Sequence, residues 1–356
     1  MRSLGGSNGA SALTGIEEQQ RRRHNELARV FGGVIGEALA DHTIIEIMVN
    51  EDGTVYVDRL YQGLQDTGER LAPIDVEDAI VTAASEMGQL VDAEHPTLSG
   101  ELPLDGSRVQ AFLPDVTTAP AIVIRKHRRQ GDDGVPALTV ADFKGAASTA
   151  EVPVEDAAPL ATLTVPELLD VAIIQRWNVV ISGGTQSGKT ALGGAYLARM
   201  SALAPRDRIV TIEDTRELRC ASHNKLMLKQ SRYRSAAQLL KDSLRARPDR
   251  IIVGEVRDGA ALDYLMACNT GHNGGFCTVH ANDALDTLYR LEDLVQMAGV
   301  PVVARSIARA VDLIVTIRKM RDGSRRVVEL ARVADELGPD GRYQLEHLTP
   351  VWPQAV

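Results

Sequence analysis

The stretch "SGGTQSGKTAL", residues 182–192, constrains the fold of this chain more than any other feature. It follows the apolar run "VVIS" at 179–182 and leads into "KTALGGAYLARM", which reads as a helix. A strand, a glycine-rich loop and a helix in this order can cradle phosphate, because the loop turns its backbone N–H groups toward phosphate oxygens and the helix adds its positive end. The sequence therefore predicts a nucleoside triphosphate site.

The loop matches the pattern GxxxxGK[ST] in full, and the strand and helix that this pattern requires are both present. A glycine-rich turn that contains a lysine by chance is the alternative, and the matching context disfavours it. We expect Lys189 to reach the β and γ phosphates and the Thr190 hydroxyl to be a ligand of Mg²⁺. The nucleotide-binding residues are predicted to be Gly183, Gly184, Thr185, Gln186, Ser187, Gly188, Lys189 and Thr190.

Acidic residues follow two further apolar runs. "RIVTIEDTREL" places Glu213 and Asp214 after one run, and "RPDRIIVGEVRD" places Glu255 after another. In a parallel sheet, both runs would deliver carboxylates to the edge where ligands bind, although an acid can also simply end a strand at the surface. Hydrolysis requires a water held near the γ phosphate. Glu213, Asp214 and Glu255 are therefore candidates to position that water.

A histidine follows another apolar run, in "GHNGGFCTVHANDALDTLYRLE" at 271–292. His280 could contact the γ phosphate or the attacking water. A lone histidine is more often structural, and the spacing alone does not overturn that interpretation, so a catalytic role needs further support.

The 356 residues allow two domains, each with its own core. Residues 1–16 are rich in Gly, Ser and Ala and are predicted to be disordered. Residues 17–130 are predicted to form a small α+β domain, with helices over 17–41 and 76–91. Its strands are predicted in "TIIEIMVN" and "TVYVDR", joined by "EDG", and in "RVQAFLP" and "AIVIRKH".

Residues 131–160 are rich in Gly, Ala, Pro and acids and are predicted to be a linker. From 161 to 356 short apolar runs alternate with helical stretches, which indicates an α/β domain with a mainly parallel sheet covered on both faces. The predicted strands are "NVVISG", "RIVTIED", "RIIVGE", "GGFCTVH" and "DLIVTIR".

The net charge of −9 argues against a protein that coats nucleic acid, because such binding needs a broad surplus of Lys and Arg. The three cysteines, Cys220, Cys268 and Cys277, show no CxxC spacing, so we expect neither a zinc site nor a disulfide framework, and a cytoplasmic location. No apolar run approaches the roughly 18 residues that span a bilayer, so any membrane association is expected to be peripheral.

Four stretches in this order resemble the secretion ATPase superfamily of type II secretion, type IV secretion and type IV pili. They look like its Walker A loop, its Asp box ("IEDTREL"), its Walker B stretch ("LRARPDRIIVGEVRD") and its His box ("TGHNGGFCTVHAN"). The resemblance covers roughly residues 25–333, because "EIMVNEDGTVYVDR" and "ELPLDGSRVQAFLPDVTTAPAIVIRKH" look like the N-terminal nucleotide-covering domain of the type IV branch. Within the superfamily, the chain is most similar to the conjugal-transfer ATPases related to the VirB type.

This resemblance implies a hexameric ring of two-domain subunits, each with a small PAS-like N-terminal domain and a RecA-like C-terminal P-loop NTPase domain. It implies ATP and Mg²⁺ as the nucleotide and metal. It also implies docking at the cytoplasmic face of an inner-membrane secretion or conjugation channel, with no strong direct binding of nucleic acid.

The resemblance also assigns roles to matching residues. It makes Glu255 the catalytic base, Glu213 a second acid that organises Mg²⁺, directly or through water, and His280 a sensor of the γ phosphate. Arg108 of "DGSRV" and Arg125 of "IRKH" match arginines that reach the γ phosphate, where a fixed positive charge would stabilise the transferring group.

Gly254 stands where many P-loop NTPases carry the Walker B aspartate, although glycine is common there in the secretion superfamily. Direct Mg²⁺ ligation by that strand is therefore doubtful.

Three alternatives share the nucleotide site: a pilus assembly or retraction ATPase, a nucleotide-dependent scaffold of the channel without useful hydrolysis, and a RecA-like DNA motor. Turnover by the purified ring would exclude the scaffold, and turnover stimulated by DNA would favour the DNA motor.

Overall fold

The computed structural model describes residues 31, 33–60, 62–103, 105–127 and 160–348. The chain divides into two compact units, Met1–Asp142 and Phe143–Val356, and each is described by itself. The segment 1–16 and nearly all of the predicted linker 131–160 lie outside the described residues. The predicted domain limits therefore stay predictions.

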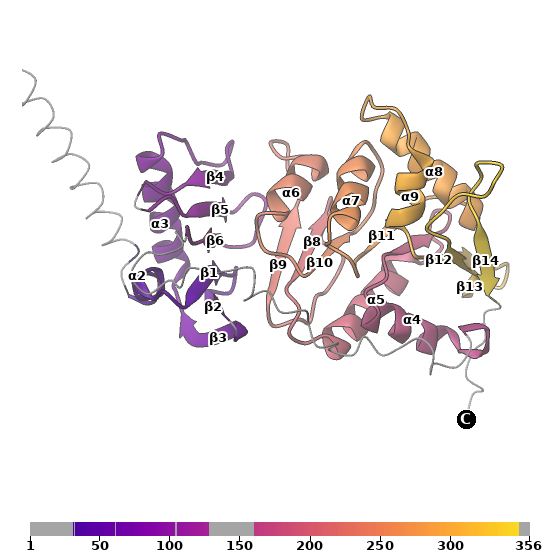
Figure 1. Cartoon of the computed structure of the whole chain (residues 1–356), viewed down its shortest axis with the longest axis horizontal. Coiled ribbons are helices and arrows are strands. Elements are labelled where there is room, and N and C mark those ends of the chain that lie inside the picture. The colour runs from indigo at the N-terminus through magenta and orange to yellow at the C-terminus, as the bar shows by residue number, and fades with distance from the viewer. Residues whose placement is uncertain (1–30, 32, 61, 104, 128–159, 349–356) are drawn as a thin grey trace, which may run out of the picture. The chain divides into compact units, whose positions relative to one another are not determined.

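The first unit is a six-stranded antiparallel sheet, in the order β3-β2-β1-β6-β5-β4, with two described helices (Figure 1). Apolar residues of both helices and of the sheet form one buried cluster. The predicted α+β character is thus confirmed. The elements are α2 (Val34–Ala40), β1 (Ile44–Val49), β2 (Thr54–Arg59), β3 (Gly63–Arg70), α3 (Pro73–Glu86), β4 (Thr97–Glu101), β5 (Arg108–Phe112) and β6 (Ala121–Arg125).

Both predicted helices of this unit differ from the structure. A single helix over 17–41 is wrong, because Gly33 adopts φ +65°, a left-handed conformation that a right-handed helix cannot contain, and α2 begins only after it. Residues 17–30 lie outside the described part. The helix predicted over 76–91 is found as α3, which starts earlier, at Pro73, and ends before Gly88 with φ +65°.

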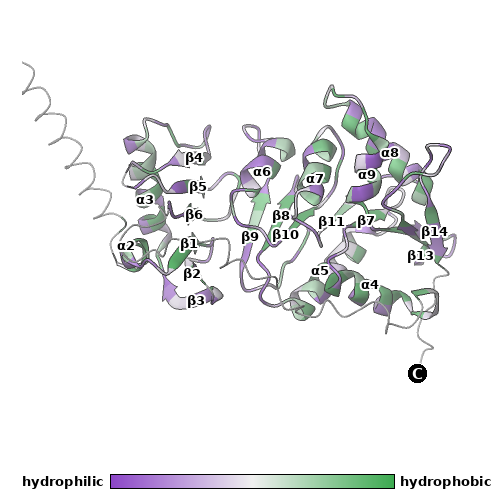
Figure 2. Ribbon diagram, viewed as in Figure 1, coloured by the Kyte–Doolittle hydropathy of each residue, from purple (hydrophilic) through white to green (hydrophobic). Residues whose placement is uncertain are grey.

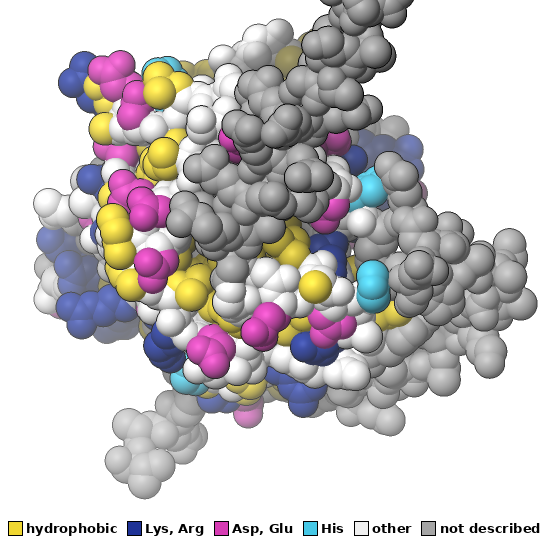
Figure 3. Space-filling model, turned by 90° about the vertical axis from the view of Figure 1, so that its left-hand side faces the viewer, with side chains coloured by type: hydrophobic (Ala, Val, Ile, Leu, Met, Phe, Trp, Pro, Cys, Tyr) yellow, Lys and Arg dark blue, Asp and Glu magenta, His cyan; other side chains and the backbone are white. Residues whose placement is uncertain are grey.

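The outward side of α3 mixes apolar and acidic side chains. Ile74 is 62% exposed and Val81 is 46% exposed, and the exposed residues of the same helix include Asp75, Glu77 and Asp78. Figure 3 shows exposed hydrophobic side chains lying among acidic ones on this face of the molecule. The acidic side chains therefore interrupt the exposed apolar surface of α3, as is usual for a surface in contact with water.

The second unit contains an eight-stranded sheet in the order β14-β13-β12-β7-β11-β10-β8-β9 (Figure 1). The six strands from β12 to β9 pair in parallel, and β13 and β14 add an antiparallel edge. The predicted mainly parallel sheet is thus confirmed. Its strands are β7 (Val179–Ser182), β8 (Ile209–Glu213), β9 (Lys225–Lys229), β10 (Arg250–Val253), β11 (Phe276–Val279), β12 (Leu313–Lys319), β13 (Arg325–Val333) and β14 (Leu345–Leu348).

Helices cover both faces of this sheet: α4 packs against α5 on one face, and α6 to α9 pack in succession on the other (Figure 1). Every residue of β7, β8, β10 and β11 is buried, and these strands are strongly hydrophobic in Figure 2. The helices are α4 (Val165–Ile174), α5 (Lys189–Leu203), α6 (Ala236–Ser243), α7 (Ala260–Asn269), α8 (Ala284–Gln296) and α9 (Ala304–Ala310), and a 3-10 turn spans Leu160–Thr162. Within the described ranges, none of the helices has both the length and the apolar character to cross a membrane.

Phe276 holds α5 against the sheet. Its side chain is fully buried on β11, and its ring meets the Tyr196 ring edge-on, with centroids 5.6 Å apart. It also fills the space above Gly193, where an added Cβ would lie 3.0 Å from the Phe276 Cε2 atom. Phe276 therefore packs on the helix that carries Lys189 at its start, in the same core as Leu197 and Met200 of that helix.

We expect Phe276→Ala to lower the free energy of unfolding of this unit by about 3–5 kcal/mol, because it removes a large buried ring and leaves a cavity. Urea unfolding followed by circular dichroism measures the change. Met297→Ala is the control: Met297 is 65% exposed, and we expect a change below about 0.5 kcal/mol. Equal effects of the two substitutions would contradict this packing.

Candidate active site

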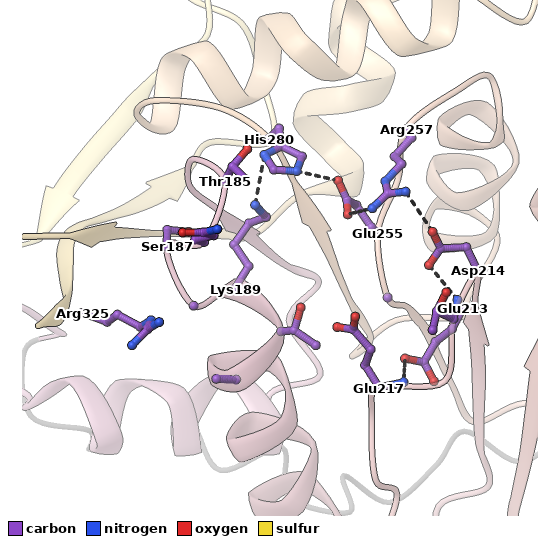
Figure 4. Close-up of a pocket in the computed structure, with 16 residues that line it drawn as sticks. Thr185, Ser187, Lys189, Glu213, Asp214, Glu217, Glu255, Arg257, His280 and Arg325 are labelled. Carbon is purple, nitrogen blue, oxygen red and sulfur yellow. Dashed lines mark hydrogen bonds and ion pairs between the residues drawn. The ribbon is translucent and has the colours of Figure 1, made fainter. Parts of the chain in front are cut away.

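The parallel register brings the ends of four strands to one edge of the sheet. Ser182 of β7 pairs with Val279 of β11, and Val253 of β10 pairs with both Cys277 of β11 and Ile212 of β8. A cavity of 480 Å³ opens there (Figure 4). Its lining residues are Thr185, Gln186, Ser187, Gly188, Lys189, Thr190, Ala191, Glu213, Asp214, Thr215, Glu217, Gly254, Glu255, Arg257, His280 and Arg325.

The glycine-rich loop has the backbone that the motif requires. Gly188 adopts φ +101° immediately before α5, a conformation that residues with a side chain rarely adopt. A Cβ on Gly183 would lie 2.3 Å from the carbonyl oxygen of Ile317 on β12, so the loop passes too close to that strand for any side chain. Within the described part of the chain, the buried Ser187 Oγ has no hydrogen-bond partner. This orphaned hydroxyl suits an anionic ligand in the loop.

Lys189, the first residue of α5, is almost fully buried and points along the cavity. Its ammonium donates to the carbonyl oxygens of Gly183 (2.9 Å) and Gly184 (3.1 Å) and to Nδ1 of His280 (3.1 Å). Burial lowers the pKa of Lys189. Because an ammonium only donates hydrogen bonds, Nδ1 of His280 accepts, and the proton of the neutral ring therefore sits on Nε2.

The contacts continue from His280 across the cavity (Figure 4). Nε2 of His280 lies 2.9 Å from Oε1 of Glu255, and Oε2 of Glu255 accepts from Arg257 at 2.6 Å. The other end of the Arg257 guanidinium donates to Asp214 at 2.8 Å. We call the series Lys189, His280, Glu255, Arg257 and Asp214 the ionic chain. It joins the phosphate loop to the ends of β8, β10 and β11.

The position of His280 in this chain controls its protonation. Burial lowers the pKa of His280, and the neighbouring Lys189 charge lowers it further, while Glu255 acts in the opposite direction. The ring is thus biased toward the neutral form, which can accept a proton or a hydrogen bond at Nδ1.

Glu213 ends β8 with a buried carboxyl group that the backbone fixes in place. Its Oε1 accepts from the N–H groups of Glu217 (3.0 Å) and Leu218 (2.9 Å). Burial raises the pKa of Glu213, and these two hydrogen bonds partly offset the rise. A Cβ on Gly254 would lie 3.0 Å from Cγ of Glu213, so glycine at the Walker B position leaves room for this carboxylate.

The donors around the cavity fit a metal that is bound together with a nucleotide. Thr190, Glu213 and Glu255 line the cavity, but the described residues contain no group of three His, Cys, Asp or Glu side chains that could hold a metal ion by itself. Mg²⁺ takes one or two protein ligands, phosphate oxygens and several waters. The Thr190 hydroxyl and the Glu213 carboxylate are suitable donors for such a site.

Arg108 and Arg125 lie in the first unit, directly opposite one another on β5 and β6. Nε of Arg125 lies 3.6 Å from Oε1 of Glu46, and the Arg125 side chain is 72% exposed. Both arginines face solvent within their own unit. Their role toward a nucleotide stays a prediction.

Three charged lining residues were assigned no role from the sequence: Glu217, Arg257 and Arg325. Arg257 stands two residues after Glu255, and Glu217 stands four residues after Glu213, so both lie inside stretches that the motif analysis had already singled out. Arg325 lies outside all of these stretches, and nothing in the sequence pattern marks it.

The environment of His280 predicts opposite shifts in two variants. Lys189→Met removes a neighbouring positive charge and should raise the pKa of His280; Glu255→Gln removes a negative one and should lower it further. In the wild type we expect a value below the usual 6.5 or so, which means that His280 takes up its proton only at lower pH than an ordinary histidine. NMR titration of ¹³C-labelled histidines, with His280→Asn to assign the signal, measures all three values.

A His280 pKa at or above the usual value in the wild type would contradict this environment. Shifts of the same sign in Lys189→Met and Glu255→Gln would contradict the ionic chain.

Comparison with known proteins adds three findings. Residues 158–342 match the family described as "Type II/IV secretion system protein". The chain is 39% identical over 338 residues to the "Conjugal transfer protein TrbB" of Rhizobium radiobacter, covering 93% of this chain and 97% of that protein. It is 38% identical over 334 residues to the "Probable conjugal transfer protein TrbB" of Sinorhizobium fredii, covering 92% of this chain and 95% of that protein.

Among solved structures, the fold matches the crystal structure of the VirB11 ATPase from the Brucella suis type IV secretion system in complex with sulphate. The TM-score is 0.74 and the identity is 26%, covering 88% of this chain and 96% of that chain. The similarity therefore extends over nearly the whole length of the chain.

Proposed function

Because this chain belongs to the type II/IV secretion system protein family and is a P-loop ATPase of that family, we propose that it hydrolyses ATP in the cavity described above to power type IV secretion or conjugative DNA transfer. One observation carries the proposal: residues 185–190 of the phosphate loop, the carboxylates of Glu213 and Glu255, and His280 come from distant parts of the sequence and line one cavity. The cavity thus contains groups suited to binding phosphates and groups suited to activating a water for hydrolysis.

The phosphate loop supplies the binding groups. In this proposal the loop N–H groups and the Ser187 hydroxyl receive phosphate oxygens, and Lys189 exchanges its contacts with the loop carbonyls for contacts with the β and γ phosphates. Thr190 and, through water, Glu213 would hold Mg²⁺, whose charge offsets the negative charge of these phosphates. The positive end of α5 adds a fixed favourable field.

Glu255 is the proposed catalytic base. It orients a water for in-line attack on the γ phosphorus and accepts the proton of that water as the bond to the β–γ bridging oxygen breaks. Its carboxylate is already held between His280 and Arg257, so little reorganisation is needed to position the water. His280, in contact with both Lys189 and Glu255, is placed to register loss of the γ phosphate.

At the level of the assembly we propose a homohexamer at the cytoplasmic face of the inner membrane, bound to components of a secretion or conjugation channel. The TrbB relatives, by name conjugal transfer proteins, and the Brucella VirB11 ATPase, which belongs to a type IV secretion system, support this placement. ATP binding would close the subunits and product release would open them, and this cycle would exert force on the channel. A pilus assembly or retraction ATPase would share this chemistry and differ in its partners.

Glu255→Gln tests the chemistry. We expect kcat for ATP hydrolysis to fall about 10²–10⁴-fold because the general base is lost, while ATP still binds. Steady-state phosphate release and the binding of a fluorescent ATP analogue measure the two effects. Glu336→Gln, a change at a side chain that is 82% exposed, should leave both unchanged.

Wild-type protein that binds ATP without turnover would favour the scaffold alternative. Turnover that appears only with single-stranded DNA and falls steeply with salt would favour a DNA motor. A Glu255→Gln protein with full turnover would remove Glu255 from the mechanism.

Substitution of the first-unit arginines tests whether that unit completes the site. We expect Arg108→Ala and Arg125→Ala each to lower kcat by about tenfold or more, since each would remove a positive charge that stabilises the transferring phosphoryl group. Arg70→Ala is the matched control, because Arg70 lies on β3 of the same unit with 63% of its side chain exposed. Unchanged kcat in both variants would exclude Arg108 and Arg125 from catalysis.

A further inference from the structure

Arg325 is the first residue of β13, and its side chain lines the same cavity as the phosphate loop. Figure 4 shows it on the far side of Lys189 from Glu255, Glu213 and Asp214. The cavity therefore has a cationic residue at the end opposite its carboxylates. None of the roles proposed above uses this arginine.

The Arg325 side chain lies across the start of α5. A Cβ on Gly188 would be 2.6 Å from Cδ of Arg325 and 3.3 Å from its Nε. Glycine at 188 thus serves two purposes, because it allows the left-handed turn of the loop and makes room for the aliphatic stem of Arg325. The stem is packed on the loop itself, which keeps the guanidinium near the phosphate-binding backbone.

The guanidinium of Arg325 has no protein partner among the described residues. The other two cations of the cavity are engaged: Lys189 donates to two loop carbonyls and to His280, and Arg257 joins Glu255 to Asp214. Arg325 is therefore an exposed cation whose stem lies over Gly188 and whose five N–H donors are available to an anion. A guanidinium beside a helix N-terminus suits phosphate oxygens, which it can contact at two points.

We propose that Arg325 binds the α and β phosphates of the nucleotide, at the end of the cavity away from the hydrolytic groups. This inference rests on the proposed function, which places the γ phosphate beside Glu255 and His280. A triphosphate whose γ end lies there extends its α and β phosphates past Lys189, toward Arg325. Arg325 is thus a binding residue for the diphosphate unit, which ATP and ADP share, and it has no part in the transfer step.

Three consequences separate this role from a catalytic one. Loss of Arg325 should lower the binding affinity for ADP and for ATP by the same factor, because both nucleotides carry the α and β phosphates. The turnover number at saturating ATP should change little, because the γ end is untouched. The loss should also extend to inorganic pyrophosphate, which has neither base nor ribose.

Arg325→Ala is the test variant, with Arg326→Ala as its matched control. Arg326 is the next residue of β13 and points to the other side of the strand, where its exposed side chain approaches Asp322 at 3.5 Å. Isothermal titration with ADP, a non-hydrolysable ATP analogue and pyrophosphate measures affinity, and thermal melting verifies that both variants fold.

We expect Arg325→Ala to lower the affinity for all three ligands about 10–100-fold, as for the loss of a pair of charge-assisted hydrogen bonds. The affinities of Arg326→Ala should stay within about twofold of the wild-type values. Arg325→Lys keeps a positive charge but loses the two-point contact, so its affinities should lie between those of Arg325→Ala and those of the wild type.

Affinities within twofold of wild type in Arg325→Ala would overturn the inference and leave the proposed function standing. A loss confined to the ATP analogue would assign Arg325 to the γ phosphate, and a loss that spares pyrophosphate would assign it to the base or ribose; either result overturns the inference. Wild-type protein that binds none of the three ligands would contradict the proposed function itself.

Discussion

The parallel pairing of β8, β10, β11 and β7 is the constraint on which the site depends. Parallel strands end at the same edge of a sheet, so this pairing gathers segments that are far apart in the sequence. The phosphate loop follows β7, Glu213 ends β8, Glu255 follows β10 and His280 follows β11. All four strands are buried on both faces, so helices cover the sheet that supports these residues on either side. The arrangement of these residues around the cavity is thus a consequence of the strand order.

Within this frame, charged groups position one another. The ionic chain runs from Lys189 through His280 to Glu255 and on through Arg257 to Asp214, so Lys189, the proposed phosphate ligand, is two contacts away from the proposed base. Any ligand that draws Lys189 toward itself changes the charge beside His280, and His280 touches Glu255. The structure therefore gives a short physical route by which occupancy of the phosphate loop would reach Glu255, the proposed base.

Sequence reasoning succeeded where burial leaves a strong pattern. The five fully or largely apolar strands of the second unit were predicted. The candidate acids and the histidine were identified because they stand at the ends of these predicted strands. It failed at polar strands: β9 alternates buried and half-buried residues between two lysines, β13 opens with two arginines, and β3 is an exposed edge. It also extended the first helix across Gly33, whose positive φ interrupts a right-handed helix. Arg325 could not be predicted, because it meets Gly188 only after the β12–β13 pair has formed.

The most direct test of the account is a structure of the wild-type protein with Mg²⁺ and a non-hydrolysable ATP analogue. The account predicts the triphosphate in the cavity at the strand ends, with Lys189 moved from the carbonyls of Gly183 and Gly184 to phosphate oxygens and the γ phosphate beside Glu255. An analogue bound elsewhere, with Lys189 still on its own loop, would contradict the central claim that this edge of the sheet is the site of ATP hydrolysis.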